Sequence, residues 1–275
     1  MLYVYCSRPS GGARELVEAL GATRLRNFDG MSFWQKGKRV KIREGDAVVC
    51  WGNPLPQLEG IRVLNGADHI NKFKAAEKFA AENVPTVQVR LVKPSLSTGL
   101  WLPRRNDHVG GDDLINPGRA DFWAKKEEIV REFRVHAFGK RSIRAGMKIP
   151  REGFLALNHA PGASENEILE ELRQAIRRGR QVYHPWIRSF DAGWRINYNG
   201  FDSTPVMKKL AKKAVKVLGL NFGAVDLGER ADGKLIVLEV NRAPGLEGNS
   251  IGRYAEYIRK WSNGPERTEE RDSDE

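Results

Sequence analysis

The sequence has few cysteines and no long apolar run. Only two of its 275 residues are cysteine, Cys6 and Cys50, and both lie in apolar stretches that read as strands. Cysteines in such stretches are typical of buried structural thiols, so we expect free thiols rather than a disulfide. No stretch of about 18 apolar residues occurs, which argues against any membrane-spanning helix. Association with a membrane is therefore not expected.

Two further signals are missing from the N-terminal region. The opening Met-Leu-Tyr-Val-Tyr-Cys lacks the basic segment and small-residue cleavage site of a secretory signal, so we expect a cytoplasmic protein. No Gly-x-Gly-x-x-Gly motif follows the first strand-like stretch, so a dinucleotide-binding turn is not indicated there. The Ser10-Gly11-Gly12 segment before the first helix suits either an anion at a helix N-terminus or a plain tight turn.

Charge is strongly unbalanced along the chain. Lys and Arg number 46 against 35 Asp and Glu, a formal net charge of +11. Residues 263–275 carry six acids and two arginines, so the rest of the chain is more basic still. Such an excess favours polyanionic ligands such as nucleotide phosphates, nucleic acid or an acidic protein. Solubility alone is the other explanation of this charge.

The most informative segment is 222–241, which has the pattern of a β-hairpin. Asp232-Gly233 is typical of a two-residue hairpin turn. If that turn closes the hairpin, Asp226 lies directly opposite Glu239, and Asn241 lies on the same side of the sheet. The opposite side then carries an apolar surface made of Val225, Leu227, Ile236, Leu238 and Val240.

Two opposed carboxylates on neighbouring strands repel each other unless something compensates their charge. Together with the amide oxygen of Asn241 they suit a hard cation, most naturally Mg²⁺ that also binds substrate phosphates. The alternative is a hairpin whose acids simply face water, as acids on strands often do.

Elements upstream of this hairpin indicate an α/β protein. Strand-like stretches at 2–7, 46–51 and 62–64 accompany a short helix at 12–20, which suggests a small unit with a parallel sheet. Residues 71–83 form an amphipathic helical pattern that ends before Val-Pro-Thr. A second amphipathic helix at 204–218 carries five lysines on its outer side.

The motif around the hairpin resembles a known family. Asp226, the Glu239-Val-Asn241 run and the following Pro-Gly-Leu-Glu are similar to the metal-binding end of the ATP-grasp superfamily. Members of carboxylate–amine ligase type that it resembles include glutathione synthetase, the ribosomal-protein glutamate ligase and compact phage-type proteins. The resemblance covers roughly residues 72–257 and is strongest over 222–247.

This resemblance implies an α/β (α+β) fold in which two subdomains grip ATP after a small α/β domain. The implied boundaries are 1–70 for the preceding domain, 71–121 for the lid subdomain, 122–262 for the C-terminal subdomain with the metal site, and 263–275 for a disordered acidic tail. The 150–182 region is an insertion relative to compact relatives.

The same resemblance assigns roles to individual positions. Asp226, Glu239 and Asn241 are the implied metal ligands, with Mn²⁺ as the alternative to Mg²⁺. Catalytic roles fall to Arg134, Arg188 and Lys148, which would steady the transferred phosphate. The implied nucleotide-binding residues are Lys72, Arg105, Gly110, Gly111, Trp123, Lys125, Lys126 and Glu132. Alternation puts His136 on the same face as Glu132 and Arg134. A structural role for His136 is the simpler interpretation.

The function implied is an ATP-dependent carboxylate–amine ligase that passes through an acyl phosphate and releases ADP and phosphate. Its partners would be a small-molecule carboxylate and amine, or an acidic macromolecular acceptor such as a protein or nucleic acid. An ATP-grasp-fold kinase is one alternative, since it needs the same nucleotide site. A basic nucleic-acid-binding protein with a degenerate nucleotide site is the other. Neither the substrates nor the oligomeric state follow from the sequence.

Overall fold

The computed structural model describes residues 1–8, 10–30, 32–35, 37–95, 100–106, 120–159, 162–184, 187–246 and 248–264. The chain forms two compact units. The first unit consists of Met1–His69, Gly219–Phe222 and Arg242–Glu275, and the second of Ile70–Leu218 and Gly223–Asn241. Within the described residues, no helix combines the length and apolar character needed to cross a bilayer. The predicted glycine pair 110–111 and most of the predicted acidic tail lie outside the described residues.

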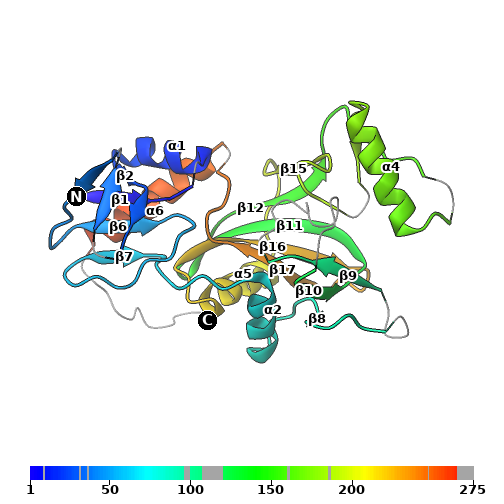
Figure 1. The fold of residues 1–275 in the computed structure, drawn as a ribbon, viewed down its shortest axis with the longest axis horizontal. Helices are drawn as coiled ribbons and strands as arrows, with labels where there is room; N and C mark the ends of the chain where they lie inside the picture. The colour runs from blue at the N-terminus through cyan, green and yellow to red at the C-terminus, as the bar shows by residue number, and fades with distance from the viewer. Residues whose placement is uncertain are drawn as a thin grey trace. The chain divides into compact units, whose positions relative to one another are not determined.

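The first unit is built on a parallel sheet, as the sequence predicts. Its described strands lie in the order β2-β1-β6-β7 (Figure 1), with bounds β1 Leu2–Tyr5, β2 Thr23–Leu25, β6 Ala47–Cys50 and β7 Arg62–Leu64. Helices α1 (Gly11–Leu20) and α6 (Ser250–Asn263) pack against each other. The Ser10 side chain accepts a hydrogen bond from Ala13 N and so caps α1, which ends at Gly21 with φ 63°.

Helix α6 belongs to the first unit, whereas the sequence-based boundaries assigned it to the C-terminal subdomain. The reason is an aromatic cluster that links distant parts of the chain. Tyr254 of α6 meets Trp51 edge-on with 5.5 Å between ring centroids and Phe222 with 5.6 Å. Burial of these rings stabilises the packing of α6 within the first unit.

A small antiparallel sheet in the first unit was not predicted. It consists of β3 (Asn27–Phe28), β4 (Phe33–Gln35) and β5 (Lys38–Val40). Its strands have two or three residues each, too few to show a period in the sequence. Phe33 anchors the sheet to the core of the first unit, where it packs against Tyr5 and Phe28.

The second unit contains a larger sheet in the order β15-β12-β11-β16-β17. Its strands are β11 Ile129–Phe138, β12 Arg141–Pro150, β15 Trp194–Asn197, β16 Phe222–Arg230 and β17 Leu235–Asn241. Helix α5 (Pro205–Val217) covers one face of this sheet and contacts β11, β12 and β17 (Figure 1). Thr204 caps α5, Pro205 occupies its first turn, and an apolar stripe that includes Met207 and Leu210 is buried beneath it.

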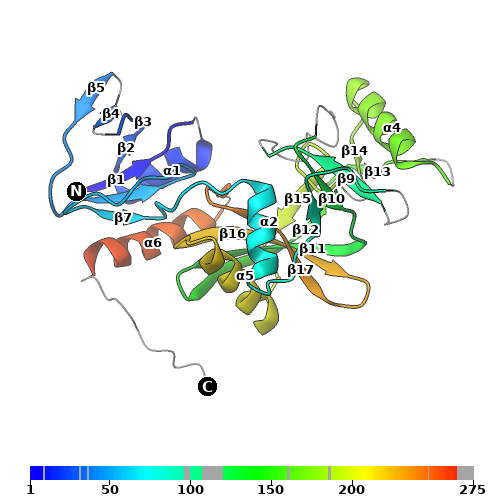
Figure 2. The ribbon, with the colours of Figure 1, turned by 60° about the horizontal axis from the view of Figure 1, so that its bottom comes forward.

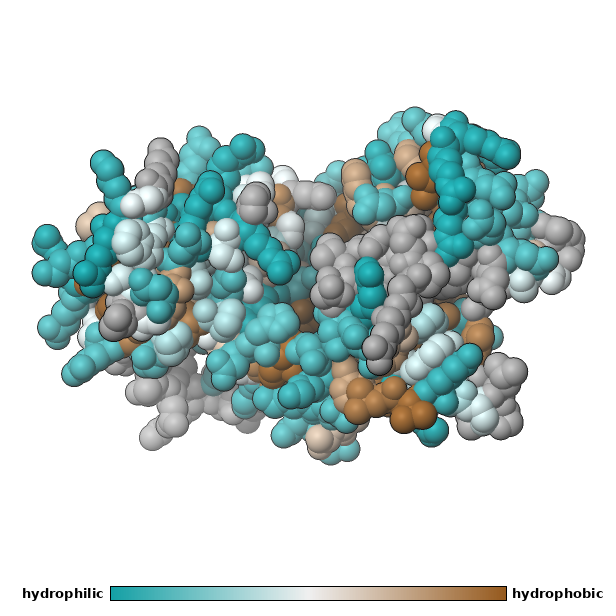
Figure 3. Space-filling model, viewed as in Figure 1, coloured by the Kyte–Doolittle hydropathy of each residue, from teal (hydrophilic) through white to brown (hydrophobic). Residues whose placement is uncertain are grey.

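A second sheet in this unit has three described strands, in the order β8-β10-β9. These are β8 Val89–Arg90, β9 Trp101–Arg104 and β10 Phe122–Lys125, and they accompany helix α2 (Lys72–Ala81), visible in Figure 2. The 150–182 region contributes β13 (Leu155–Ala156), α4 (Glu165–Arg177) and β14 (Val182–Tyr183), which share a small core that includes Leu172 and Trp194. Figure 3 shows hydrophilic residues over much of one face of the molecule, with apolar residues in small groups.

Candidate active site

The β16–β17 hairpin positions the acidic residues. Asp226 pairs with Glu239, and Ala224 pairs with Asn241, so the predicted opposition of the two carboxylates is confirmed. The predicted two-residue turn is wrong. Arg230 N donates to Lys234 O and Gly233 N donates to Arg230 O, which leaves three residues in the loop. Gly233 has φ 77°, the left-handed conformation that glycine adopts without strain.

A β-bulge between Asp226 and Leu227 reconciles the longer loop with the predicted pairing. The bulge places one extra residue in β17, which offsets the shift that the loop introduces. It also changes the apolar face. Val237 pairs with Leu227 and is fully buried, although uninterrupted alternation had placed it on the face of Asp226 and Glu239.

Asp226 is the centre of a buried charge network. Arg134 on the neighbouring strand β11 donates from Nε to Asp226 Oδ1 at 2.7 Å and from Nη2 to Oδ2 at 2.8 Å. Lys148 Nζ on β12 donates to Asp226 Oδ2 at 3.3 Å and to Glu132 Oε1 at 2.8 Å. Two carboxylates and two cations from three adjacent strands therefore neutralise one another on one face of the sheet.

Burial and charge act in opposite directions in this network. Burial alone would raise the pKa of Asp226, but Arg134 and Lys148 outweigh it and hold that pKa well below its usual range. Burial would lower the pKa of Lys148, yet Asp226 and Glu132 raise it. For Glu132, burial outweighs the attraction of Lys148, and its pKa is raised. The network is thus stable only while its members keep their partners.

Glu239 and Lys72 form a more exposed part of the site. Lys72 Nζ at the start of α2 lies 3.3 Å from Glu239 Oε2, and the two side chains are 26% and 36% exposed. Asn241 ends β17 and is half-buried. The sequence-predicted Lys72 is therefore brought to the predicted metal ligands, on the side that solvent reaches.

The donor set around the hairpin fits a hard divalent cation. Two carboxylates occupy directly paired positions, and an amide oxygen follows two residues along β17. Mg²⁺ is typically bound through one or two carboxylates together with substrate phosphates. Among the described residues, no group of three or more His, Cys, Asp and Glu side chains gathers into a complete metal centre by itself.

Arg188 lies near the start of β11. Its Nη2 donates to Ile129 O at 2.9 Å and to Val130 O at 3.2 Å, and its guanidinium lies 5.1 Å from the Trp194 ring centroid. The buried Nε and Nη1 atoms have no acceptor among the described residues. Burial lowers the pKa of Arg188, against the opposing charge of Glu132. Unsatisfied N–H donors on a cation suit an anionic ligand.

The other predicted nucleotide residues that the structure describes lie in, or directly after, strands of the three-stranded sheet. Trp123 in the central strand β10 pairs with Arg90 of β8 and Pro103 of β9, while Lys125 N and Lys126 N donate to Gln88 O and Leu100 O. Burial lowers the pKa of Lys126. Arg105 directly follows β9. These positions are separate from the Asp226 network, and their nucleotide role stays a prediction.

His136 has a structural position. It is fully buried, and its Nε2 lies 2.9 Å from the Tyr198 hydroxyl. Burial, reinforced by the neighbouring Arg134, lowers its pKa to about 3, so the ring is neutral near pH 7. A neutral buried ring that is satisfied by a tyrosine fits the simpler of the two sequence-based interpretations.

The overall structure is similar to several solved ligases. The ATP-grasp ligase PsnB, in a structure with Mg, ADP and a phosphomimetic variant of its minimal precursor, superposes with a TM-score of 0.59 at 14% identity, covering 95% of this chain and 98% of PsnB. The macrocyclase MdnC of Microcystis aeruginosa, bound to precursor peptide MdnA, gives 0.53 at 11% identity over 94% and 99% of the two chains. The D-alanine–D-alanine ligase of Bacillus anthracis gives 0.53 at 12% identity over 94% and 91%.

The chain has the ATP-grasp fold. Its hairpin, α5 and the two sheets of the second unit are the elements that the sequence resemblance implied, so the predicted fold class is confirmed. Sequence comparison gives shorter matches. A probable α-L-glutamate ligase of Vibrio cholerae is 44% identical over 64 residues, and one of Alkalilimnicola ehrlichii is 51% identical over 45 residues.

These sequence matches are partial. The Vibrio cholerae match spans 21% of this chain and 21% of the relative, and the Alkalilimnicola ehrlichii match spans 16% and 15%. No family model matches the chain. The ATP-grasp fold is thus established by structural similarity along nearly the whole chain, whereas activity and substrates require a separate argument.

Proposed function

We propose that this ATP-grasp protein is an ATP-dependent ligase that joins a carboxylate to an amine and releases ADP and phosphate. The observation that carries the proposal is the Arg134–Asp226–Lys148–Glu132 network beside the Asp226–Glu239 pair. It combines oxygen ligands for a divalent cation with fixed cations for phosphate oxygens. Phosphoryl transfer needs this charge neutralisation and positioning more than a covalent contribution from the protein.

The proposed roles follow from this geometry. Asp226, Glu239 and Asn241 would hold Mg²⁺, or Mn²⁺ through the same oxygens, and the ion would neutralise nucleotide phosphates. Lys72, 3.3 Å from Glu239, would contact the same phosphates. The other nucleotide contacts proposed are Arg105, Gly110, Gly111, Trp123, Lys125, Lys126 and Glu132.

Arg134, Lys148 and Arg188 would act on the transferred group. A substrate carboxylate oxygen attacks the γ-phosphorus, the bond from that phosphorus to ADP breaks, and an acyl phosphate forms. An amine then attacks the acyl carbon, inorganic phosphate leaves, and the amine loses a proton. Negative charge on the phosphoryl oxygens is opposed by these three side chains, and Arg188 still has two N–H groups to donate.

We take peptide carboxylates and glutamate as the first substrates to test. The partly matching relatives are described as probable α-L-glutamate ligases, and PsnB and MdnC were solved with precursor peptides. The basic net charge of +11 also favours acidic substrates. A small-molecule carboxylate and amine remain within the proposal, because the network's proposed role is to bind phosphate and metal rather than the acceptor.

The deciding experiment measures ADP release with Mg-ATP across pooled amino acids, amines, carboxylates and acidic peptides, with mass spectrometry of the products. A product with the mass of both substrates less water supports the ligase. ADP accompanied by a stable phosphorylated product and no condensed amide indicates a kinase instead.

A matched pair of variants assigns the activity to this site. Glu239→Ala should abolish turnover without loss of the fold, because this side chain is half-exposed. Glu256→Ala on the exposed side of α6 removes an acid from an ion pair with Lys260 and should leave turnover unchanged. Equal ADP release by Glu239→Ala and the wild type would contradict the assignment.

A further inference from the structure

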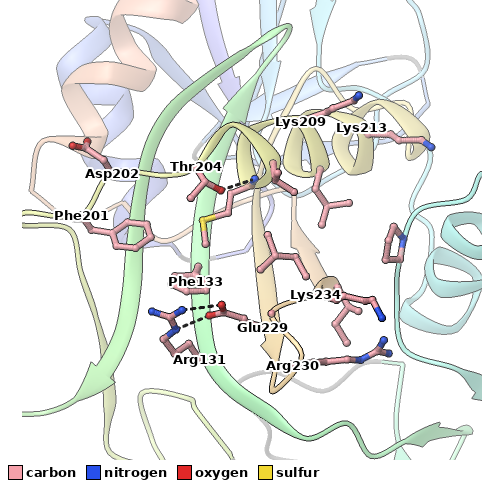
Figure 4. A pocket seen from close by; sticks show the side chains of 17 residues that line it. Arg131, Phe133, Phe201, Asp202, Thr204, Lys209, Lys213, Glu229, Arg230 and Lys234 are labelled. Carbon is pink, nitrogen blue, oxygen red and sulfur yellow. Dashed lines mark hydrogen bonds and ion pairs between the residues drawn. The ribbon is translucent and has the colours of Figure 1, made fainter.

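A cavity of about 740 Å³ lies on the face of the five-stranded sheet that α5 covers. Its lining comes from α5, the end of the β16–β17 hairpin, β11 and residues 201–204, as Figure 4 shows. Phe133 lines it, and Phe133 is the residue between Glu132 and Arg134 in β11. Because neighbouring residues of a strand point to opposite faces, this cavity is separate from the charge network.

The floor of the cavity is apolar. The Phe133 and Phe201 rings stack with 5.3 Å between centroids and 23° between planes. Met207, Leu210 and Ile236 extend this floor and are buried. Val206 stands at the rim and is 63% exposed, which is unusual for a large aliphatic side chain beside an apolar cavity. An apolar side chain of a ligand would bury here.

The rim of the cavity is basic on two sides. Lys209 and Lys213 project from α5, and Arg230 and Lys234 project from the hairpin (Figure 4). Lys209 has no acidic partner among the described residues, and Lys234 is 75% exposed although it contacts Asp232. Arg230 donates to Glu127 Oε2 at 2.9 Å, and Lys213 Nζ donates to Asn83 O at 3.2 Å. Lys209 and Lys234 are therefore the rim cations most available to a ligand.

Acidic side chains at the cavity are fewer. Glu229 is neutralised by Arg131, which donates to its two oxygens at 2.5 and 2.8 Å. Asp202 is the other acid in the lining. The excess of positive charge around an apolar floor is complementary to a ligand that is both acidic and apolar.

We propose that this cavity docks an acidic peptide segment through one bulky apolar side chain. The apolar anchor would enter above Phe133 and Phe201, and flanking Glu or Asp side chains would meet cations on both sides. A peptide suits this arrangement because its acidic groups are spaced along a chain, as the lysines of α5 and the hairpin are spaced along the rim. The inference rests on the proposed function in one respect: the docked peptide is the substrate itself, or the reacting group of the substrate is part of that peptide.

The test uses a fluorophore at the rim. In Val206→Cys, the new thiol is exposed, whereas Cys6 and Cys50 are buried and burial raises the pKa of Cys50 to about 12. Labelling should therefore be selective. The probe is a pool of nine-residue peptides in which Glu and Asp alternate with Phe, Leu and Met. We expect a saturable change in fluorescence, and at least tenfold weaker binding when the apolar positions are replaced by Ser.

Charge reversal locates the binding. Lys209→Glu and Lys234→Glu should each weaken the peptide affinity at least tenfold at 150 mM salt. Lys208→Glu and Lys216→Glu change the net charge equally on exposed positions of α5 that do not line the cavity, and should have little effect. Equal weakening by all four variants would show non-specific attraction and overturn the proposal.

Two other results would also overturn it. Absence of saturable binding by the pool is one, and equal binding of the Ser-substituted pool is the other. Neither readout requires ATP or turnover. A protein that binds the peptide but releases no ADP would therefore refute the proposed function and leave the docking site in place. A protein that releases ADP but does not bind the peptide would refute the docking site and leave the proposed function in place.

Discussion

Arg134 holds Asp226 by two parallel hydrogen bonds, 2.7 and 2.8 Å long, between adjacent strands of the sheet. The two side chains are only 19% and 7% exposed. Bidentate pairs of this kind are stronger and more directional than a single ion pair. The carboxylate that we propose as a metal ligand is thus held in place by Arg134.

Replacement of Arg134 should be costly to the fold. Arg134→Ala leaves a buried carboxylate without its main partner, and we expect the free energy of unfolding to fall by about 3–5 kcal/mol. The control is Arg131→Ala, because Arg131 also makes a bidentate pair but its side chain is 59% exposed. That change should destabilise the protein much less, because solvent screens an exposed ion pair. Urea unfolding measures both, and similar losses would contradict the role of burial.

Stability should depend on pH through two buried histidines. His136 and His184 are fully buried, and burial lowers the pKa of each to about 3. Below about pH 6.5 the unfolded chain binds protons that the folded chain does not, so stability falls as pH drops from about 6.5 toward 3. Each histidine contributes ~1.4 kcal/mol per pH unit in that range.

Urea unfolding at pH 7.5, 6 and 5 tests this expectation. His136→Gln should reduce the slope of unfolding free energy against pH by the contribution of one histidine. This holds whatever the effect of the substitution on stability at pH 7.5. His69→Gln serves as the control because His69 is exposed, and it should retain the wild-type slope. A slope unchanged in His136→Gln would show that this ring is protonated in the folded state.

Lys72 should affect nucleotide binding more than stability. Its side chain is 26% exposed and it forms an ion pair with the half-exposed Glu239, so Lys72→Ala leaves little buried charge unpaired. We expect Mg-ATP affinity to fall about tenfold, equivalent to ~1.4 kcal/mol. Lys78→Ala, on the exposed end of the same helix, should bind as the wild type does. Calorimetric titration with a non-hydrolysable ATP analogue measures the difference.

Gly146 should tolerate no side chain. It pairs with Arg134, and an added Cβ would lie 2.7 Å from Asn197 O and from Ile196 Cγ2. Gly146→Ala must push β15 away from β12, and we expect a loss of about 1–3 kcal/mol. Gly252→Ala in α6 meets open space and should be neutral or stabilising by up to about 1 kcal/mol. Thermal unfolding of the two variants provides the comparison, and equal melting temperatures would show that β15 yields freely.

The positions of helices α2 and α5 are predicted well from the sequence. The pattern at 71–83 became α2, Lys72–Ala81, and that at 204–218 became α5, Pro205–Val217. Their caps and apolar stripes are local features, so they are visible without tertiary information. The short strands β3 to β5 were missed because two or three residues are too few to show alternation.

The turn rule applied to the hairpin predicts the correct pair of carboxylates, although the two-residue turn that it assumes does not form. Asp232-Gly233 favours a two-residue turn, yet the loop has three residues and a bulge restores the Asp226–Glu239 pair. A bulge is decided by packing on both faces of a sheet, which a single sequence does not display. The same limit explains why Val237 was not predicted on the apolar face.

The sequence by itself determined the ATP-grasp resemblance, the paired carboxylates and the polar face of β11, because these depend on residue type and a period of two along a strand. Only the tertiary structure decided that Arg134 and Lys148 neutralise Asp226, since those residues are far apart in sequence and meet through the order of strands in the sheet. It also created the cavity beneath α5, whose apolar floor and basic rim come from α5, β11, the β16–β17 hairpin and residues 201–204. Contacts of that kind arise when distant elements bury their apolar faces together, and no local pattern records them.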